Sequence, residues 1–222
     1  VFWQQENLLQ QYLPNLDRYI VLSDYDKRDY MEKLGIDCEV KINPRSFVSE
    51  KKCDVKSKRF LMATRFVYAK GLDLMMESFE EFCKEDSEWE LDIIGDGDLF
   101  DQIRADAKKR HLEKRVHFVG YTNEPEKYYL NSSVFLLPSR WEGWPMVIME
   151  AFEFGLPVIA YHMGAMDLII DDGKTGFLPE AFDPHKFAQA MLKLAHDEEL
   201  RARMSANAIA KSDDFSIDKA VK

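Results

Sequence analysis

The chain has 222 residues, with a hydrophobic fraction of 46% and a charged fraction of 32%, which are typical of a soluble globular protein. Its net charge of −10 argues against nucleic acid as a partner, because neutralising phosphates requires a basic surface. No apolar run reaches the roughly 18 residues of a membrane span. Its three cysteines lack C-x-x-C spacing, which is typical of thiols in a reducing compartment, so we expect a cytoplasmic protein.

Residues 1–47 alternate between helix and strand patterns, in the order helix 1–17 with its end near Pro14, strand 18–23, helix 25–34 and strand 39–43. Ser23 is a suitable cap for the second helix, and Gly35 a suitable stop. Residues 48–58 are polar and have no apolar periodicity, which predicts an interdomain linker whose lysines are solvated.

From residue 59 onward, apolar strand patterns alternate with helix patterns. The predicted strands are 59–64, 89–95, 116–120, 133–138, 157–161 and 176–178. The predicted helices are 71–84, 98–111, 124–130, 145–154, 165–170, 184–195 and 198–210. This order predicts an α/β domain over residues 59–211: a Rossmann-like parallel sheet with helices on both faces. Residues 212–222 are expected to begin a returning C-terminal helix.

In such sheets, ligands bind in the loops at the carboxyl ends of the strands. Here those loops are 64–71, 95–98, 120–123, 139–145 and 161–165. Arg65 and Lys70 lie in the first and could hold a diphosphate, although exposed loop cations are often only solvated. Gly95 and Gly97 lack the third glycine of a dinucleotide fingerprint, so we interpret them as a tight turn. The scattered histidines predict no metal site.

The stretch S-R-W-E-G-W-P-M-V-I-M-E-A-F-E-F-G, residues 139–155, combines a loop with an apolar helix. Pro145 occupies the place expected for the first helical residue, and Gly155 the left-handed stop. Glu150 is then the anomaly, because a carboxylate in apolar surroundings requires a partner. With Glu142 in the preceding loop, this helix start is a candidate site for an anionic, hydroxyl-rich ligand.

Taken in order, these motifs resemble the nucleotide-sugar half of a GT-B glycosyltransferase of family 4, a large retaining family. The resemblance covers about residues 18–218. It rests on R-Y-I-V-L-S-D-Y, I-N-P, T-R-F-V-Y-A-K-G, I-G-D-G, V-H-F-V-G-Y, L-P-S-R-W-E-G-W-P-M-V-I-M-E-A, G-L-P-V-I-A and D-D-G-K-T-G-F-L. The spacing of the two glutamates, Glu142 and Glu150, is the most specific of these features.

The resemblance implies a role for each candidate residue. Arg65 and Lys70 would hold the donor diphosphate, and Glu142 would contact the transferred sugar and help to organise the reacting centre. Glu150 would bind the ribose hydroxyls. The start of the helix would face the phosphates through Gly143, Trp144, Pro145, Met146 and Val147, and the base would meet the backbone at Tyr121 and Thr122.

Several departures from the family pattern affect donor identity rather than charge. Thr64 replaces the glycine usual before the arginine, the loop has G-W-P where G-F-G or G-F-P is commoner, and Asp167 stands where glutamate is frequent. The donor is expected to be a UDP- or GDP-type sugar used without a metal.

The resemblance also implies that residues 1–47 are a remnant of the acceptor-side domain. A glycan or lipid-linked acceptor would bind the rest of that domain, in a surface polysaccharide or lipopolysaccharide pathway. Peripheral association with the inner face of the membrane would fit such an acceptor. The 222-residue chain by itself is expected to bind donor weakly and to transfer nothing. The alternatives are a GT-B epimerase, an inverting transferase, or a nucleotide-binding domain without catalysis.

Overall fold

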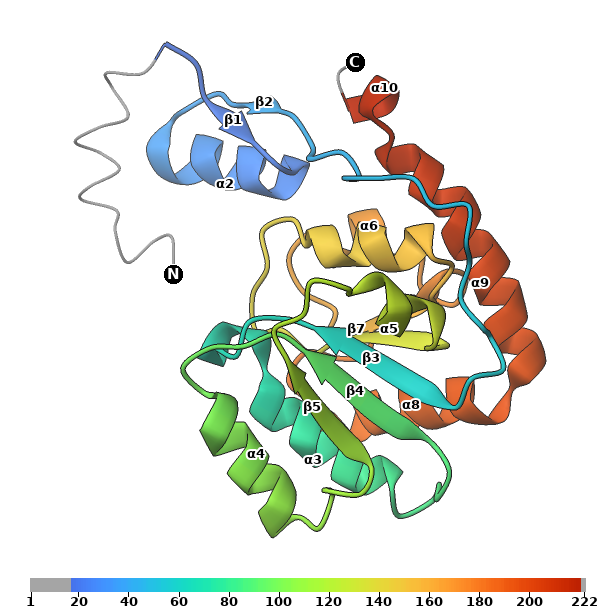
Figure 1. Ribbon diagram of the computed structural model, residues 1–222. Coiled ribbons are helices and arrows are strands. Elements are labelled where there is room, and N and C mark those ends of the chain that lie inside the picture. Colours follow the sequence, from blue (N-terminus) through green and yellow to red (C-terminus); the bar gives the residue numbers. More distant parts are fainter. Residues whose placement is uncertain (1–16, 221–222) are drawn as a thin grey trace.

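The computed structural model describes residues 17–220, so nearly all of the helix predicted over residues 1–17 lies outside the described residues. The main body is a six-stranded parallel sheet in the order β5-β4-β3-β6-β7-β8 (Figure 1). The strands are β3 (Arg59–Ala63), β4 (Glu90–Ile94), β5 (Val116–Gly120), β6 (Val134–Leu137), β7 (Val158–Ala160) and β8 (Gly176–Phe177). The predicted parallel α/β sheet is confirmed.

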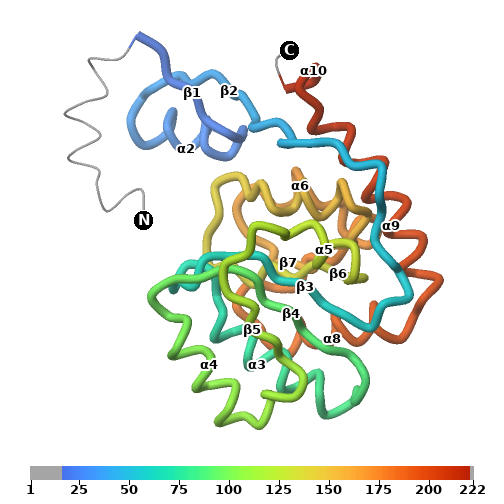
Figure 2. Tube along the Cα trace, in the orientation of Figure 1, coloured from blue at the N-terminus to red at the C-terminus, as the bar shows by residue number. Residues whose placement is uncertain are grey.

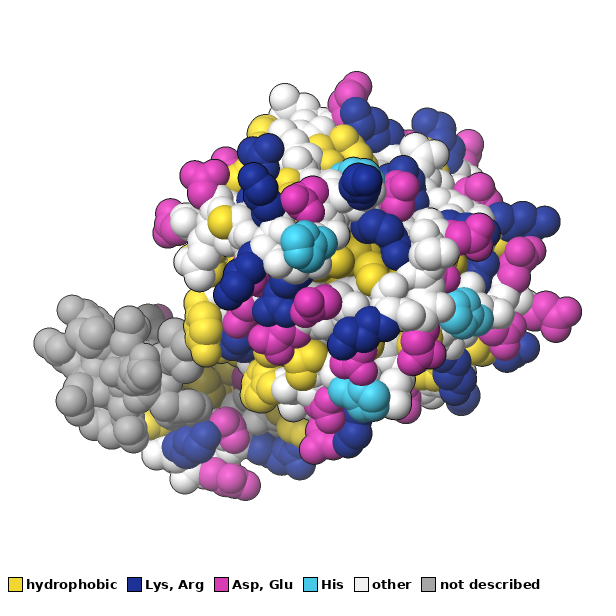
Figure 3. Space-filling model, turned by 90° about the horizontal axis from the view of Figure 1, so that it is seen from below, with side chains coloured by type: hydrophobic (Ala, Val, Ile, Leu, Met, Phe, Trp, Pro, Cys, Tyr) yellow, Lys and Arg dark blue, Asp and Glu magenta, His cyan; other side chains and the backbone are white. Residues whose placement is uncertain are grey.

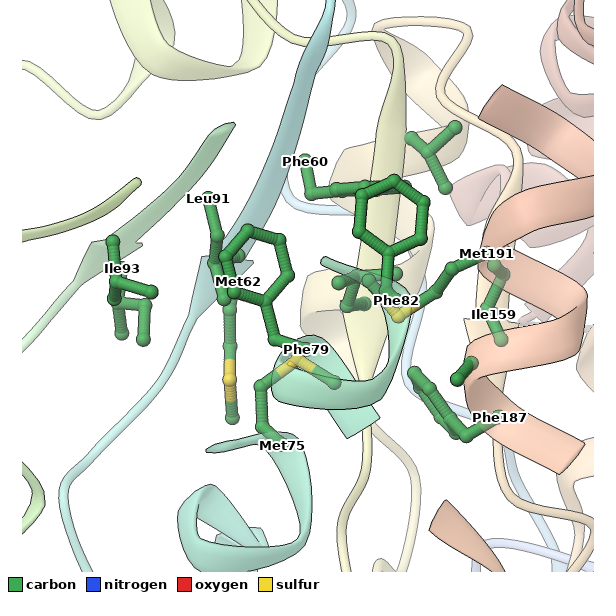
Figure 4. Packing of buried hydrophobic residues seen from close by; sticks show 14 of the residues in the cluster. Phe60, Met62, Met75, Phe79, Phe82, Leu91, Ile93, Ile159, Phe187 and Met191 are labelled. Atoms are coloured by element: carbon green, nitrogen blue, oxygen red, sulfur yellow. The ribbon is translucent and has the colours of Figure 1, made fainter. Parts of the chain in front are cut away.

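Helices cover both faces of this sheet, so the central strands β3, β4, β6 and β7 are largely buried. The helices are α3 (Leu72–Phe82), α4 (Phe100–Lys109), α5 (Glu126–Leu130), α6 (Met146–Glu153), α7 (Met166–Ile169), α8 (Pro184–His196) and α9 (Glu198–Ser212). Along β3 the side chains alternate: Phe60 and Met62 pack with α3 and α8, whereas Leu61 packs with α6 and α7. Figure 4 shows the first of these clusters, in which Phe79 and Phe187 approach the sheet from α3 and α8.

Two helices begin two residues later than the sequence pattern predicts, each because of a turn. Gly97 accepts a hydrogen bond from the Phe100 amide, so α4 begins at Phe100 rather than at residue 98. The Thr122 hydroxyl accepts one from the Glu124 amide, and the cap of the next helix is Pro125, so α5 begins after that proline.

Residues 20–40 form a small unit beside the main sheet (Figure 2). Strands β1 (Ile20–Val21) and β2 (Glu39–Val40) pair in parallel and flank α2 (Asp24–Leu34). The predicted cap and stop are confirmed, because the Ser23 side chain accepts from the Asp26 amide and Gly35 has φ 68°. The Tyr25 hydroxyl donates to Asp167, 2.8 Å away, which joins this unit to α7.

Residues 44–58 lie against the C-terminal body, and Figure 1 shows them running past α9. The Cys53 amide donates to the Phe154 carbonyl at 2.7 Å, and the Asp54 amide donates to the Leu130 carbonyl at 3.0 Å. After α9 the chain continues through η4 (Asp213–Phe215) into α10 (Ile217–Ala220). Across residues 17–220, no helix is both long and apolar enough to cross a bilayer.

Acidic and basic side chains are intermixed on the face seen in Figure 3. That face has no broad basic surface of the kind that phosphate backbones require.

Candidate functional site

The loops that follow β3 and β6 meet at the carboxyl edge of the sheet. The Lys70 ammonium, in the short helix η3 (Tyr68–Lys70), lies 2.7 and 2.9 Å from the two carboxylate oxygens of Glu142. The Ser139 hydroxyl donates to the same carboxylate at 2.6 Å. The Glu142 side chain is only 9% exposed and that of Lys70 20%, so this ion pair is shielded from solvent on most sides.

A close backbone approach fixes the distance between the two loops. Gly71, which caps the start of α3, has φ 63°, and a Cβ there would lie 2.0 Å from the Pro138 carbonyl oxygen. Only glycine fits such a position without moving the backbone. The chain can therefore bring Lys70 directly to Glu142.

A second link between the same loops comes from Arg140. Its guanidinium forms a two-pronged pair with Asp73 at 2.7 and 2.6 Å, and its amide donates to the Ala69 carbonyl at 2.8 Å. The hydrogen bond from Arg140 holds the pKa of the Asp73 carboxyl below its ordinary value. Nothing in the sequence distinguishes Arg140 or Asp73 from ordinary surface charges, so neither could be predicted to lie at the site.

The glycines after β4 form a tight turn, as predicted. A Cβ at Gly95 would lie 1.8 Å from the Thr64 carbonyl oxygen, and one at Gly97 would lie 2.8 Å from that of Phe66. These glycines let the β4 loop approach the β3 loop, which contains Arg65. The glycine pair therefore serves backbone packing.

The start of α6 differs from the prediction at Pro145. This proline has φ −74° and ψ 98°, which is extended backbone, so it is the cap and Met146 is the first helical residue. No side chain caps the first turn, which leaves its leading amides available to a ligand. Met146 and Val147 are half-buried, and Gly155 ends this segment with φ 81°, the left-handed stop that was predicted.

Glu150 is not the buried carboxylate that the apolar sequence around it suggested. It is half-exposed, because its face of α6 borders a cavity. The buried carboxylate is Glu153, which is 2% exposed and accepts from the Ser49 amide at 2.9 Å and the Arg45 guanidinium at 2.8 Å. The prediction failed because both glutamates have apolar neighbours in sequence, and only the tertiary packing decides which face of the helix is covered.

The cavity beside Glu150 has a volume of about 850 Å³ and lies between α5, α6 and residues 47–51. Tyr129 donates from its hydroxyl to one Glu150 oxygen at 2.9 Å. Burial, reinforced by that carboxylate, raises the pKa of Tyr129 well above its ordinary value, so the hydroxyl remains a donor. Within residues 17–220, no hydrogen bond to the other Glu150 oxygen is found, so it can accept from a ligand hydroxyl.

The remaining candidates form no hydrogen bond or ion pair with the side chains of Lys70 and Glu142 in the described part of the chain. The Arg65 side chain is exposed and forms no ion pair with any described residue. Tyr121 is 78% exposed. The Trp144 ring is buried against Phe215, with centroids 6.2 Å apart, which leaves its backbone as the part able to meet a ligand. Gly143 is exposed, and a Cβ there would lie 3.9 Å from Leu22 of the N-terminal unit.

The structure thus brings Lys70 and Glu142 together but places Glu150 in a separate cavity. Lys70 and Glu142 are absent from the lining of that cavity. In the described part of the chain, no group of three or more His, Cys, Asp or Glu side chains could hold a metal ion. An anionic group near Lys70 and Arg65 and a hydroxyl-bearing group at Glu150 are the ligands that this chemistry suits.

Comparison with known proteins shows the family. The family described as Glycosyl transferases group 1 matches residues 46–211, which is more than half of the chain. The chain belongs to the group 1 glycosyl transferases. Arg65, Lys70, Glu142 and Glu150 all lie within the matched segment of this glycosyl transferase.

Two relatives illustrate the similarity. The chain is 28% identical over 209 residues to an uncharacterized glycosyltransferase of Haemophilus influenzae, covering 93% of this chain and 59% of the relative. It is 29% identical over 158 residues to a poly(glycerol-phosphate) alpha-glucosyltransferase of Bacillus subtilis, covering 70% of this chain and 23% of the relative. This glycosyl transferase chain therefore spans little more than half of the first relative and about a quarter of the second.

The fold matches those of solved glycosyltransferases. A mutant of S. aureus TarM in complex with Fondaparinux, alpha-GlcNAc-glycerol and UDP has a TM-score of 0.89 at 23% identity, covering 98% of this chain and 45% of that one. The pneumococcal O-GlcNAc transferase GtfA in complex with UDP and GlcNAc has a TM-score of 0.83 at 22% identity, covering 96% and 45%. At these identities the likeness shows a shared fold, the Rossmann-like domain of GT-B enzymes.

Proposed function

We propose that this chain is the donor-binding part of a retaining glycosyltransferase of family 4. The enzyme moves a sugar from a nucleotide-diphosphate sugar to a glycan or lipid-linked acceptor. The observation that carries this proposal is the Lys70–Glu142 ion pair, because it joins the loops after β3 and β6. The strand order reverses between these two neighbouring strands, and open α/β sheets bind ligands at such a switch point.

In the proposed reaction, the bond between the anomeric carbon and the donor diphosphate breaks, and the acceptor oxygen bonds to the same face of that carbon. The proton of the acceptor hydroxyl passes to the departing phosphate. Negative charge grows on the diphosphate, which Arg65, Lys70 and the uncapped start of α6 would stabilise without a metal. Glu142 would orient Lys70 and meet the sugar hydroxyls, and the reaction requires no protein nucleophile.

The nucleoside would bind on the Glu150 side of α6. The free oxygen of Glu150 would accept from the ribose hydroxyls, while Tyr129 fixes the carboxylate. The backbone at Tyr121 and Thr122 would meet a uracil or guanine base.

The acceptor, the pathway and the location are part of the same proposal. Relatives include enzymes named for poly(glycerol-phosphate), for poly(ribitol-phosphate) and for amylovoran biosynthesis, which supports a role in surface polysaccharide or lipopolysaccharide synthesis. Such work would take place in the cytoplasm or at the inner face of the membrane. Because this chain spans only part of its relatives, we propose that it binds donor but that transfer requires further chain on the acceptor side.

The decisive experiment compares variants at Glu142. Calorimetry on the 222-residue chain should show that it binds UDP or GDP. The Lys70→Met variant should bind the same nucleotide more weakly. In the full-length enzyme, Glu142→Gln should lower the transfer rate by roughly 10²–10³-fold, the usual effect of removing one preorganised polar group. Glu85→Gln, at an exposed position outside the lining of the Glu150 cavity, is the control and should leave the rate unchanged. Unaltered transfer in Glu142→Gln would instead favour a nucleotide-binding domain without catalysis.

A further inference from the structure

Two large aromatic side chains stand exposed at the same edge of the sheet as the Lys70–Glu142 pair. Tyr68 is 61% exposed and Trp141 is 43% exposed. Their ring centroids lie 5.9 Å apart and the ring planes meet at 55°, so the two rings present differently tilted faces. Contiguous exposed apolar surface of this kind marks an interaction site more often than a single exposed residue does.

The Tyr68 ring is held in place by Arg140, and the Trp141 ring contacts Tyr68. The Arg140 guanidinium lies 4.0 Å from the Tyr68 ring centroid and donates to the Tyr68 carbonyl at 3.0 Å. The same guanidinium is fixed by its two-pronged pair with Asp73. A ligand that binds these rings would therefore meet a preorganised surface and lose little side-chain entropy.

The surroundings of the rings are close to neutral. Arg140, the cation that lies against the Tyr68 ring, is already paired with Asp73, so it is not free to attract an anion to the rings. This balance disfavours a diphosphate there. It favours an uncharged ligand with a flat apolar face and a polar edge, and the C–H face and hydroxyl edge of a pyranose ring have that form.

The positions of the rings in the chain relate a bound sugar to the proposed reacting centre. Trp141 directly precedes Glu142, and Tyr68 lies two residues before Lys70, so both rings border the proposed reacting centre. The ribose-binding candidate Glu150 lies in a different cavity, whose lining contains neither ring. A pyranose on these rings would thus sit beside the reacting centre on the side away from the nucleoside.

We propose that Tyr68 and Trp141 form a platform that binds a pyranose ring of the acceptor glycan. This inference rests on the proposed function. It assigns an acceptor contact to the donor-side domain, with Arg140 and Asp73 as positioning residues that hold Tyr68.

The test uses the 222-residue chain and observes the indole N–H signal of Trp141 by NMR, assigned with the Trp141→Phe variant. The probes are three neutral trisaccharides, maltotriose, cellotriose and chitotriose, with glycerol 3-phosphate as a ligand that has no ring and UDP as a donor fragment. At least one trisaccharide should shift the Trp141 signal, whereas glycerol 3-phosphate should not. Tyr68→Ala and Trp141→Ala should weaken trisaccharide binding, followed in the variants by the NMR signals of the trisaccharide itself, roughly tenfold or more, as loss of a central aromatic contact does.

Conservative and distant variants separate a binding role from a folding role. Tyr68→Phe and Trp141→Phe keep a ring and should keep trisaccharide binding within about threefold. Phe182→Ala removes another exposed ring, 52% exposed, and should change neither trisaccharide nor UDP binding. Arg140→Lys keeps the charge but loses the two-pronged pairing with Asp73, so it should weaken trisaccharide binding by a larger factor than UDP binding.

Three outcomes would overturn the platform. The first is that no trisaccharide shifts the Trp141 signal at millimolar concentration. The second is that the alanine variants bind trisaccharide as well as the parent chain does. The third is that UDP shifts the signal and the alanine variants weaken UDP instead, which would assign the rings to the donor. Normal UDP binding without a trisaccharide response rejects the platform alone, whereas failure to bind any nucleotide would reject the proposed function.

Discussion

Glu153 shows how much one side chain contributes to joining separate parts of this chain. Its carboxylate, 3% exposed, receives the Arg45 guanidinium at 2.8 Å and the Lys52 ammonium at 3.2 Å. Arg45 also contacts Ser212 at the end of α9. One carboxylate therefore ties residues 45–52 to α6 and to the end of α9.

We expect Glu153→Ala to destabilise the fold strongly. Removing one partner of a buried ion pair leaves the other charge uncompensated, which costs about 3–5 kcal/mol in comparable cases. Urea denaturation followed by circular dichroism should show a much lower midpoint. Glu124→Ala removes a solvent-exposed carboxylate, so its midpoint should stay close to that of the parent chain. Similar midpoints for the two variants would contradict the buried network.

At the scale of elements, the loops after β3 and β6 are held together by close backbone contact and by two ion pairs. Gly71 and Gly35 offer a matched comparison, because both have left-handed backbone, with φ 63° and 68°. A Cβ at Gly71 would lie 2.0 Å from a backbone oxygen, whereas one at Gly35 would meet nothing within 4 Å. The two positions therefore differ in steric clash but not in backbone strain.

Gly71→Ala should consequently lower the thermal midpoint by clearly more than Gly35→Ala does. Strain alone costs about 1–2 kcal/mol for a residue with a Cβ in this conformation, which is the whole effect expected at Gly35. At Gly71 the Pro138 carbonyl must also move, which would separate Lys70 from Glu142. Differential scanning calorimetry on both variants measures the difference, and equal losses would show that the loops are free to part.

At the scale of the whole molecule, several carboxylates are stabilised in their charged form. Burial alone would raise the pKa of Glu153, but the Ser49 amide, Lys52 and Arg45 together hold it below 4.5. Arg140 lowers the pKa of Asp73, and Lys219 lowers that of Asp214. These groups bind a proton less readily in the folded chain than in the unfolded one.

At pH values above the ordinary carboxyl pKa values of 3.8 and 4.5, the free energy of unfolding should therefore be roughly constant. It should fall as the pH drops below them, through the lower pKa values that these carboxyls have in the folded chain. The sign follows because a lowered folded pKa gives stability that is complete above the unfolded pKa and is lost on protonation. Urea midpoints measured between about pH 7 and about pH 3 provide the check. A midpoint that rises on acidification would refute this assignment.

The order of strands and helices could be predicted from the sequence because it depends on near neighbours in the chain. Apolar runs bounded by glycine and proline indicated each strand of the parallel sheet, and Ser23 and Gly35 indicated the limits of α2. The carboxyl-end loops containing Lys70 and Glu142 could be selected as well, because parallel strands all end at one edge. Helix starts were less certain, since Pro145 differs from a first helical residue only in its ψ angle.

By itself, then, the sequence determined the fold class and which loops carry the charged candidates. Only the tertiary structure decided that Lys70 contacts Glu142, 72 residues away, and that Arg140 holds Tyr68 beside that pair. It also decided that Glu153 rather than Glu150 is buried. The physical reason is that local periodicity fixes which side chains share a helix face, whereas burial and ion pairing depend on what the remainder of the chain places against that face.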